Sequence, residues 1–377
     1  MTVNFDNAAT TFPKPPEVRL AVEKALVRYG SAGRGGHPIA VRGSELLYSA
    51  RETIAEFFGA EPENVVFTLN CTHALNIAIQ GIAREGGHVI ISSLEHNSVI
   101  RPVYALAKSK KIQYSIAEVS PSDAQTLENF ARLIRPDTRA IICMIASNVT
   151  GQVLPWRKIG ALCQEKKICF IADGAQACGV LPINLKSDNI NILCTAGHKG
   201  LYGITGTGLL ISDGAFAIPP LMQGGSGSLS SLPEMPDFLP DALEAGTMSV
   251  IGAASLRAGV NFVKKKGIQN IFRSETAICE RFCQRLEKMP DVILYREPGA
   301  DYVPIVSFNI RNRRSEEVAS ELGKQGFCLR AGLHCAPLAH YALKTTEITE
   351  GTVRFAPSVF SGMQETDRLC DSIKKLV

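Results

Sequence analysis

The 377-residue sequence has few of the features that mark membrane, exported or nucleic-acid-binding proteins. It begins MTVNFDNAATT, without the basic-then-apolar order of an export signal, and no apolar run approaches the roughly 18 residues that a membrane span needs. The net charge is only +4, and the densest basic runs, 264–266 and 311–314, have no interleaved aromatic residues. Such runs are typical of solvated helix ends or turns, so we expect neither a membrane nor a nucleic-acid partner.

Cysteine is present but unpatterned. The eleven cysteines are odd in number and never spaced as CxxC, which argues against a disulfide framework or a zinc ribbon. Free thiols persist best in a reducing compartment, so we expect a cytoplasmic protein. The stretch HCAPLAH contains three possible metal ligands in His334, Cys335 and His340. It fits no common zinc pattern and has no evident fourth ligand, so we expect no metal.

Strand-like runs alternate with helix-length segments over the first two thirds of the chain. The hydrophobic fraction of 45% and charged fraction of 20% are ordinary for a globular protein. Alternation of this kind predicts an α/β fold with a large, mainly parallel sheet covered by helices. The clearest strand candidates are VVFTL at 65–69, HVIISS at 88–93, AIICMIAS at 140–147 and ICFIADG at 168–174.

The pattern changes after a stretch rich in glycine, serine and proline at 219–240, which we interpret as a long functional loop. A helical run from about Gly252 to Met289 follows, and then strand candidates such as YVPIVSFNI and a closing helix. This predicts a large α/β domain at 17–250 and a smaller α+β domain formed by 1–16 together with 251–377.

The strongest local signal is TAGHKGLYGITGTG at 195–208, in which Lys199 follows a histidine and precedes a glycine-rich turn. A lysine can form a Schiff base with an aldehyde cofactor, and glycines allow a close approach of backbone. An ordinary surface lysine is the alternative. The GxGxxG spacing of a dinucleotide site is not met.

A second signal is ADGAQACG, which places Asp173 at the carboxyl end of a strand and Gln176 three residues later. Ligands of α/β sheets bind at that edge, and a carboxylate there suits a protonated ring nitrogen. The alternative is that Asp173 only caps the next helix.

A third signal is LRAGLHCAP at 329–337, where Cys335 follows a glycine-containing turn and lies five residues after Arg330. For an arbitrary cysteine a buried structural thiol is the usual interpretation. The position of Cys335 in this motif favours a reactive thiol, which His334, Arg330 or another cation would help to ionise.

With these motifs in this order, the chain resembles the class V members of the fold-type I pyridoxal-phosphate enzymes, and among them the cysteine desulfurases. The similarity runs from FDNAATT at 5–11 to TVRFAPS at 352–358. It implies pyridoxal 5'-phosphate as cofactor, conversion of L-cysteine to L-alanine, and transfer of the sulfur to Cys335 as a persulfide. It also implies a homodimer and a sulfur-acceptor protein or small thiol.

The resemblance assigns roles to residues around the cofactor ring. Lys199 would be the Schiff-base lysine and Asp173 the partner of the ring nitrogen. Gln176 would donate to the ring hydroxyl, and His96, in LEHNSV, would stack on the ring and take part in catalysis. Asn148, in SNVTGQ, would contact cofactor or substrate.

The resemblance also implies a phosphate site. Thr72 and His73, in NCTHALN, fall at a strand-to-helix turn whose free N–H groups attract an anion. His198 would contribute as well, and Thr247, in LEAGTMS, would be lent by the partner subunit. Many relatives have serine where this chain has Ala196, so we expect that phosphate hydrogen bond to be either absent or moved to Thr195.

Substrate binding would depend mainly on arginine. Arg354, in TVRFAPS, matches the residue that binds the substrate carboxylate, for which a planar bidentate donor is suited. Arg330 is expected at the same end of the site, and Arg34 and His37, in GRGGH, at its mouth.

The cysteine motif is similar to that of the desulfurase group with a short R-x-G-x-H-C sequence, although Leu333 stands where close relatives often have histidine. Alternatives therefore stay open. One is a selenocysteine lyase acting on L-selenocysteine, and another is a class V aminotransferase or other lyase in which Cys335 is incidental. A third, from a different class, is a non-catalytic sulfur-relay scaffold.

Overall fold

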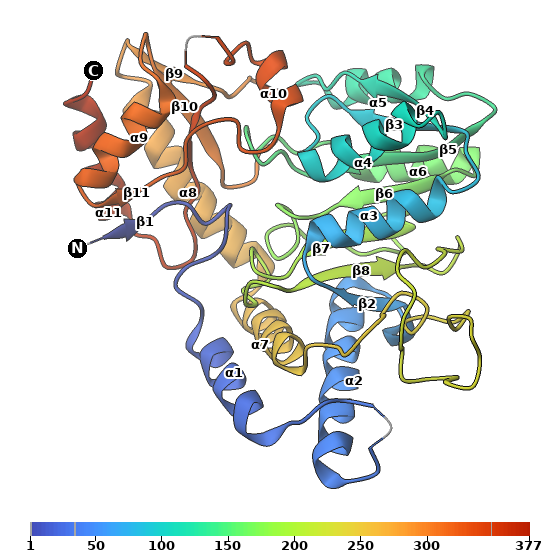
Figure 1. The fold of residues 1–377 in the computed structure, drawn as a ribbon. Coiled ribbons are helices and arrows are strands. Elements are labelled where there is room, and N and C mark those ends of the chain that lie inside the picture. Colours follow the sequence, from blue (N-terminus) through green and yellow to red (C-terminus); the bar gives the residue numbers. More distant parts are fainter. Residues whose placement is uncertain (1, 34, 348) are drawn as a thin grey trace.

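A seven-stranded sheet forms the centre of the protein in the computed structural model, which describes residues 2–33, 35–347 and 349–377 (Figure 1). Its strand order is β2-β8-β7-β6-β5-β3-β4. The strands from β4 to β7 run parallel, whereas β8 is antiparallel to both of its neighbours. The predicted α/β fold with a mainly parallel sheet is confirmed. The strands are β2 (Val65–Thr68), β3 (His88–Ser92), β4 (Gln113–Ala117), β5 (Thr138–Met144), β6 (Cys169–Asp173), β7 (Ile192–Ala196) and β8 (Gly208–Ser212).

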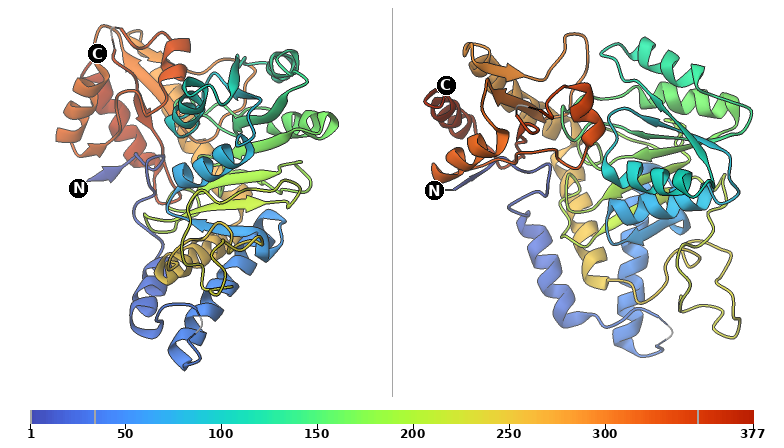
Figure 2. Two further views of the ribbon diagram at one scale, coloured as in Figure 1. Left: turned by 45° about the vertical axis from the view of Figure 1, so that its right-hand side comes forward. Right: turned by 45° about the horizontal axis from the view of Figure 1, so that its top comes forward.

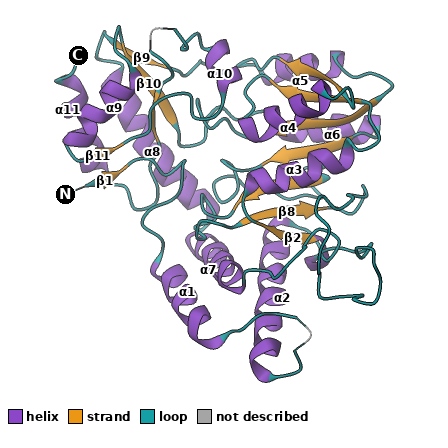
Figure 3. Ribbon diagram, viewed as in Figure 1, coloured by secondary structure: helices purple, strands orange, loops and turns teal. Residues whose placement is uncertain are grey.

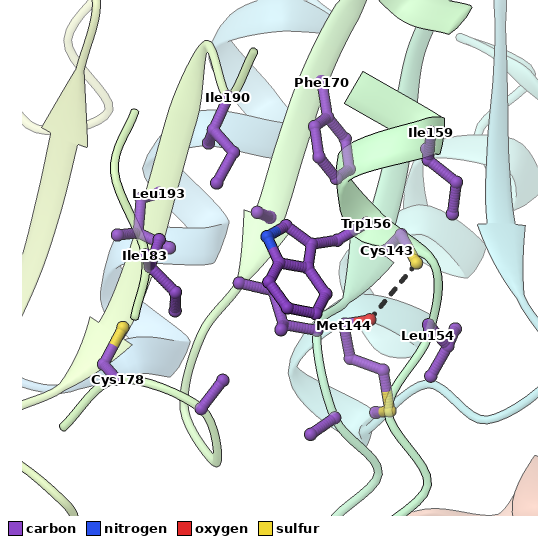
Figure 4. Packing of buried hydrophobic residues seen from close by; sticks show 14 of the residues in the cluster. Cys143, Met144, Leu154, Trp156, Ile159, Phe170, Cys178, Ile183, Ile190 and Leu193 are labelled. Atoms are coloured by element: carbon purple, nitrogen blue, oxygen red, sulfur yellow. Dashed lines mark hydrogen bonds between the residues drawn. The ribbon is translucent and has the colours of Figure 1, made fainter. Parts of the chain in front are cut away.

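Alternating side chains of the strands enter two cores, one on each face of the sheet. Along β5, Ile141 and Cys143 belong to one cluster, and Ala140 and Ile142 to the other. Burial on both faces explains why these strands are nearly continuous apolar runs. One face is covered by α3 (Cys71–Ile82) and α4 (Asn97–Lys108), and the other by α5 (Asp123–Arg132) and α6 (Trp156–Lys166). Figure 4 shows the core on the α5 and α6 side of the sheet, around Trp156.

A second group of elements contains both ends of the chain (Figure 2). Strand β1 (Val3–Asn4) pairs in parallel with β11 (Phe327–Cys328), and a three-stranded sheet has the order β12-β10-β9. Phe5 packs in a core whose other members come from Ile278 onward. The boundaries of the two-domain division remain a prediction. The further elements are β9 (Val292–Leu294), β10 (Val306–Ile310), β12 (Val353–Phe355), α8 (Ile268–Leu286), α9 (Ser315–Lys324), α10 (Pro337–Ala342) and α11 (Met363–Lys374).

The predicted helical run from about Gly252 to Met289 is helical and consists of two helices. It is divided into α7 (Val250–Lys266) and α8 at Gly267, whose φ of 81° ends the first helix. The two helices then pack on different partners. Helix α7 contacts α1 (Pro16–Arg28) and α2 (Pro38–Phe58), and α8 contacts α11. None of the helices in the described ranges is both long and apolar enough to cross a membrane.

The segment between β8 and α7 contains no helix or strand (Figure 3) and includes the predicted loop. A buried ion pair attaches its end to the rest of the fold. Glu244 accepts hydrogen bonds from both terminal nitrogens of Arg51 in α2, and its Oε1 also accepts one from the Phe67 N–H of β2 at 2.6 Å. Arg51 in turn donates to the Val65 carbonyl. This network joins α2, β2 and the loop that contains Thr247.

Removal of the Glu244 charge is expected to destabilise the protein strongly. Glu244→Gln leaves the buried Arg51 charge uncompensated, and breaking such a pair costs about 3–5 kcal/mol. The measurement is urea unfolding followed by the fluorescence of Trp156, the single tryptophan. The matched control is Glu61→Gln, which breaks the exposed Glu61–Lys186 pair and should cost under about 1 kcal/mol. Equal losses in the two variants would contradict the structural role of the buried pair.

Candidate active site

A cavity of about 390 Å³ opens at the carboxyl ends of the parallel strands, next to the group of elements that contains the chain termini. Several strands end at its wall, and the β11–β12 region supplies the opposite wall. Sheets of this kind bind ligands at that edge. Of the predicted site residues, the structure brings together Thr72, His96, Asn148, Asp173, Gln176, His198, Lys199, Arg330, Cys335 and Arg354 around this cavity.

Lys199 follows β7 and faces the cavity from a turn. Burial lowers the pKa of its amine, although Asp173 and Cys71 act in the opposite direction. A lowered pKa favours the neutral, nucleophilic amine.

Asp173 is the last residue of β6 and is buried. Its Oδ1 accepts a hydrogen bond from the Ala175 N–H at 2.8 Å and contacts the Cys71 thiol at 3.4 Å. Turns follow it, not a helix, so the helix-cap alternative is wrong. Gln176 donates from Nε2 to the Ala8 carbonyl at 3.0 Å.

His96 is the N-cap of α4, and its ring is fixed by Ser98. The Ser98 N–H donates to His96 Nδ1 at 3.0 Å, and the Ser98 hydroxyl lies 2.7 Å from the same nitrogen. Nδ1 is therefore an acceptor, so the neutral ring carries its proton on Nε2. Burial lowers the pKa of His96, which keeps the ring neutral. The Ser98 hydroxyl also lies 2.7 Å from Thr72 Oγ1, which connects the predicted ring-stacking residue to the predicted phosphate site.

The predicted phosphate site lies at the start of α3. Asn70 is the N-cap, and its Oδ1 accepts the His73 N–H at 2.9 Å. Thr72 lines the cavity, whereas the His73 ring lines a separate hollow of about 220 Å³. His198 lines the cavity from the Lys199 turn, and burial together with Lys199 and Lys14 lowers its pKa to about 4. Its Nδ1 is buried and has no hydrogen-bond partner.

Two arginines form the opposite end of the cavity. Arg354 in β12 is buried and donates from one terminal nitrogen to the Asn148 carbonyl at 2.9 Å. Its other terminal nitrogen lies 3.2 Å from Asp6 Oδ1, and its Nε is without a partner. Arg330 is more exposed, and its Nε donates to Asp6 Oδ2 at 3.1 Å.

Cys335 lies on a short loop at the same end. Both His334 and Cys335 have positive φ angles, 46° and 56°, a conformation that non-glycine residues seldom adopt. The loop is held from the other wall, since Asn148 Nδ2 donates to the His334 carbonyl at 2.8 Å and the Asn97 N–H donates to the Cys335 carbonyl at 2.7 Å. Gly351 allows this packing, because a Cβ there would lie 2.2 Å from backbone of Gly332.

His334 does not supply the cation expected beside Cys335. Its ring is buried, and its Nε2 donates to the Thr352 carbonyl at 3.0 Å. Burial lowers the pKa of His334 well below its usual range, so the ring is neutral. Positive charge at this end of the cavity comes from Arg330 and Arg354.

Several predicted site residues lie elsewhere. The Thr195 hydroxyl is buried and donates to the Gly174 carbonyl at 3.3 Å, so the expected substitute for the missing serine faces away from the cavity. Thr247 is exposed and lines the hollow that contains the His73 ring. His37 is the exposed N-cap of α2. Arg34 lies outside the described residues.

The structure adds residues that the sequence did not reveal, namely Asp6, Asn70, Cys71 and Ser98. Ser98 lies two positions after His96, the N-cap of α4, and its N–H is one of the free donors in the first turn of that helix. Asp6 had no local signal, because its two arginine partners are more than 300 residues away in the chain. Within the described part of the chain, no group of three or more metal-ligating side chains is arranged to hold a metal ion.

Known proteins resemble this chain over its full length. The family model described as Aminotransferase class-V matches residues 3–369. A probable cysteine desulfurase of Methanothermobacter thermautotrophicus is 28% identical over 381 residues, which cover 98% of this chain and 94% of that protein. A probable cysteine desulfurase of Pyrococcus abyssi is 28% identical over 388 residues, covering 100% and 94%.

Solved structures agree with this similarity. The apo structure of a cysteine desulfurase from Thermococcus onnurineus NA1 has a TM-score of 0.93 at 26% identity and covers 100% of this chain and 94% of that one. A cysteine desulfurase from Escherichia coli has a TM-score of 0.88 at 23% identity, covering 99% and 94%, and so supports the fold alone.

Glu95, the residue before His96, is buried beneath the site. Its Oε1 accepts hydrogen bonds from the Ser92 hydroxyl at 2.5 Å and from the Met144 N–H at 2.9 Å, and its Oε2 has no partner. Burial raises the pKa of its carboxyl group to about 8. The folded protein therefore binds a proton at Glu95 that the unfolded chain releases at lower pH.

This raised pKa predicts a pH dependence of stability. Its contribution is fully present below the ordinary carboxyl pKa of 4.5 and is lost as the pH rises through about 8. Glu95→Gln should therefore gain stability relative to the unchanged protein between these values. Urea midpoints measured from pH 4.5 to 8.5 test this, with Glu165→Gln, at the exposed pair with Lys166, as the control. Parallel pH profiles for all three proteins would show that Glu95 is ionised when buried.

Proposed function

The chain belongs to the class V aminotransferase family and has the fold-type I architecture of pyridoxal-phosphate enzymes, and from this premise we propose that it is a cysteine desulfurase. It converts L-cysteine to L-alanine and transfers the sulfur to Cys335 as a persulfide. One observation carries the proposal: Lys199 and Cys335 line the same cavity, together with Asp173 and Arg354. The likeness to the cysteine desulfurases of several organisms supports it.

The cavity fits pyridoxal 5'-phosphate. Lys199 would attach the cofactor, Asp173 would face the ring nitrogen, and Gln176 would lie near the ring hydroxyl. His96 would stack on the ring, and Thr72 and His198 would bind the phosphate at the start of α3. Among the buried polar atoms of cavity-lining residues that have no hydrogen-bond partner, His198 Nδ1 and Asn148 Oδ1 support a polar ligand. Once bound, the cofactor would supply an electron sink beside the substrate Cα.

The residues of the chain account for substrate binding and for the first proton transfer. The unpaired Nε of Arg354 and the exposed guanidinium of Arg330 are available to a substrate carboxylate. Lys199 Nζ, favoured as the neutral amine, would remove the Cα proton. The neutral ring of His96, held by Ser98, would stack on the cofactor ring and keep it in position.

Sulfur transfer follows at Cys335. Its thiolate attacks the substrate sulfur, so that an S–S bond forms and the C–S bond breaks. The electron pair of the broken bond stays on carbon, which takes up a proton and becomes the methyl group of L-alanine. The persulfide on Cys335 then passes to an acceptor protein or a small thiol.

The second candidate is a selenocysteine lyase, which the same residues would serve. The exposed Cys335 at the cavity argues against an aminotransferase in which this thiol is incidental. Lys199, Asp173 and Arg354 in one cavity argue against a non-catalytic scaffold.

We also propose a homodimer in the cytoplasm. Thr247 is exposed and does not line the cavity of its own chain, which is consistent with its expected contact to the phosphate of the partner subunit. The eleven cysteines are all free, and such thiols persist in a reducing compartment.

The attachment of the cofactor to Lys199 is tested by reduction. We expect the purified yellow protein to lose its colour with borohydride and to retain the reduced cofactor on the Lys199 peptide, as located by mass spectrometry. Lys14 is the alternative attachment site for the cofactor, because burial lowers its pKa to about 8 and its Nζ lies 2.8 Å from the His198 carbonyl. A reduced cofactor on the Lys14 peptide would overturn the assignment.

The role of Cys335 is tested with two substrates. Because sulfur leaves poorly without a nucleophile to accept it, Cys335→Ala should lose nearly all alanine formation from L-cysteine while still binding the cofactor. The C–Se bond is weaker and the selenol more acidic, so the same variant should retain measurable activity on L-selenocysteine. Alanine, sulfide and selenide release are measured side by side.

The matched control for this test is Cys328→Ala, which removes the other exposed cysteine from a position outside the cavity. We expect it to keep its activity on both substrates. If Cys335→Ala also keeps full activity on L-cysteine, Cys335 is not the sulfur acceptor. If it loses both activities equally, the thiol is required for selenium as well.

A further inference from the structure

Asp6 lies directly behind the two arginines of the cavity. Its Oδ1 is 3.2 Å from a terminal nitrogen of Arg354, and its Oδ2 is 3.1 Å from Nε of Arg330. The two arginines are also neighbours through their backbones, since the Arg354 N–H donates to the Arg330 carbonyl at 2.8 Å. One carboxylate therefore bridges two guanidinium groups.

The position of Asp6 is fixed by the fold. Asp6 follows Phe5, which is buried in the core of the group of elements that contains both chain ends. Its backbone forms an isolated β-bridge with Ala356, next to β12. Its own N–H donates to Asn4 Oδ1 at 3.2 Å. Asp6 does not line the cavity, whereas both arginines do. It therefore reaches a bound ligand only through Arg330 and Arg354.

The charges at this end of the cavity can be counted. Arg330 and Arg354 each contribute one positive charge and Asp6 removes one, which leaves a single positive charge while Cys335 is a neutral thiol. The ring of His334 is neutral and hydrogen-bonded to Thr352. A single positive charge matches a ligand with one carboxylate, whereas two would favour a ligand with a second anionic group.

We propose that Asp6 is a positioning residue that sets the charge selectivity of the cavity. By neutralising one arginine charge and holding both guanidinium groups, it favours amino acids with a single carboxylate over those with an additional anionic group. This inference rests on the proposed function, in which Arg354 binds the substrate carboxylate. It extends that function to the class of substrate that the cavity rejects.

The experiment compares a monoanion with a dianion of similar size. Calorimetric titration of the holoenzyme with propionate and with succinate, at pH 7.5 and constant ionic strength, gives the ratio of their dissociation constants. In Asp6→Asn, succinate binding should strengthen relative to propionate by about tenfold, because the cavity gains one net positive charge. In Arg330→Gln the ratio should move in the opposite direction.

The control variant is Asp367→Asn. Asp367 bridges Arg281 and Arg285 on the surface between α8 and α11 in the same manner, away from the cavity, and its loss should leave the ratio unchanged. A purely structural role of Asp6 would weaken both ligands equally and would overturn the proposal. So would a changed ratio in Asp6→Asn without the opposite change in Arg330→Gln. If the unchanged protein forms no alanine from L-cysteine, the proposed function fails, and the binding ratios still decide the role of Asp6.

Discussion

A cation inside a protein needs a nearby anion, and this requirement organises the cavity. Transfer of an unpaired charge from water into the protein costs several kcal/mol, so Arg354, and Lys199 when it is protonated, depend on carboxylates from other elements. Burial lowers the pKa values of Lys199 and Arg354. Asp173, at the end of β6, raises the pKa of Lys199, and Asp6 raises that of Arg354. Each pair forms within one group of elements: Asp173 and Lys199 lie at or just after the ends of neighbouring strands of the large sheet, whereas Asp6 and Arg354 lie where the two ends of the chain meet. Residues of both groups line the cavity.

The N-terminal segment contacts elements at both ends of the cavity. Thr10 Oγ1, the Thr11 N–H and Lys14 Nζ all donate to the carbonyl of His198, and Thr11 Oγ1 reaches the carbonyl of Lys199. The turn that carries Lys199 is thus held from outside the sheet by residues that precede the first helix. The same segment contains Asp6, so it acts on both ends of the cavity.

Most of the sheet and the centre of the site could be predicted from the sequence, because both follow from local order along the chain. Asp173 comes directly after an apolar strand, and parallel strands end at one edge, so its place in a ligand site follows. The division at Gly267 was missed because apolar positions with helical spacing continue on both sides of it. Thr195 was assigned by its position in a motif, but alternation along β7 directs its side chain to the Gly174 carbonyl. The contacts of Asp6 join residues more than 300 positions apart in the chain, and the local pattern of the sequence does not predict such contacts.

The backbone at Cys335 determines how sulfur would leave the site. Two consecutive residues with positive φ are costly, and this conformation persists here because Asn97 and Asn148 hold the loop from the opposite wall. A loop held in this way keeps the thiol at the cavity and does not carry it outward. Leu333, two residues before Cys335, is exposed, and under the proposed function its apolar side chain would be open to contact by a sulfur acceptor. Under the proposed function, the backbone conformation that holds Cys335 at the cavity would also determine where a sulfur acceptor binds.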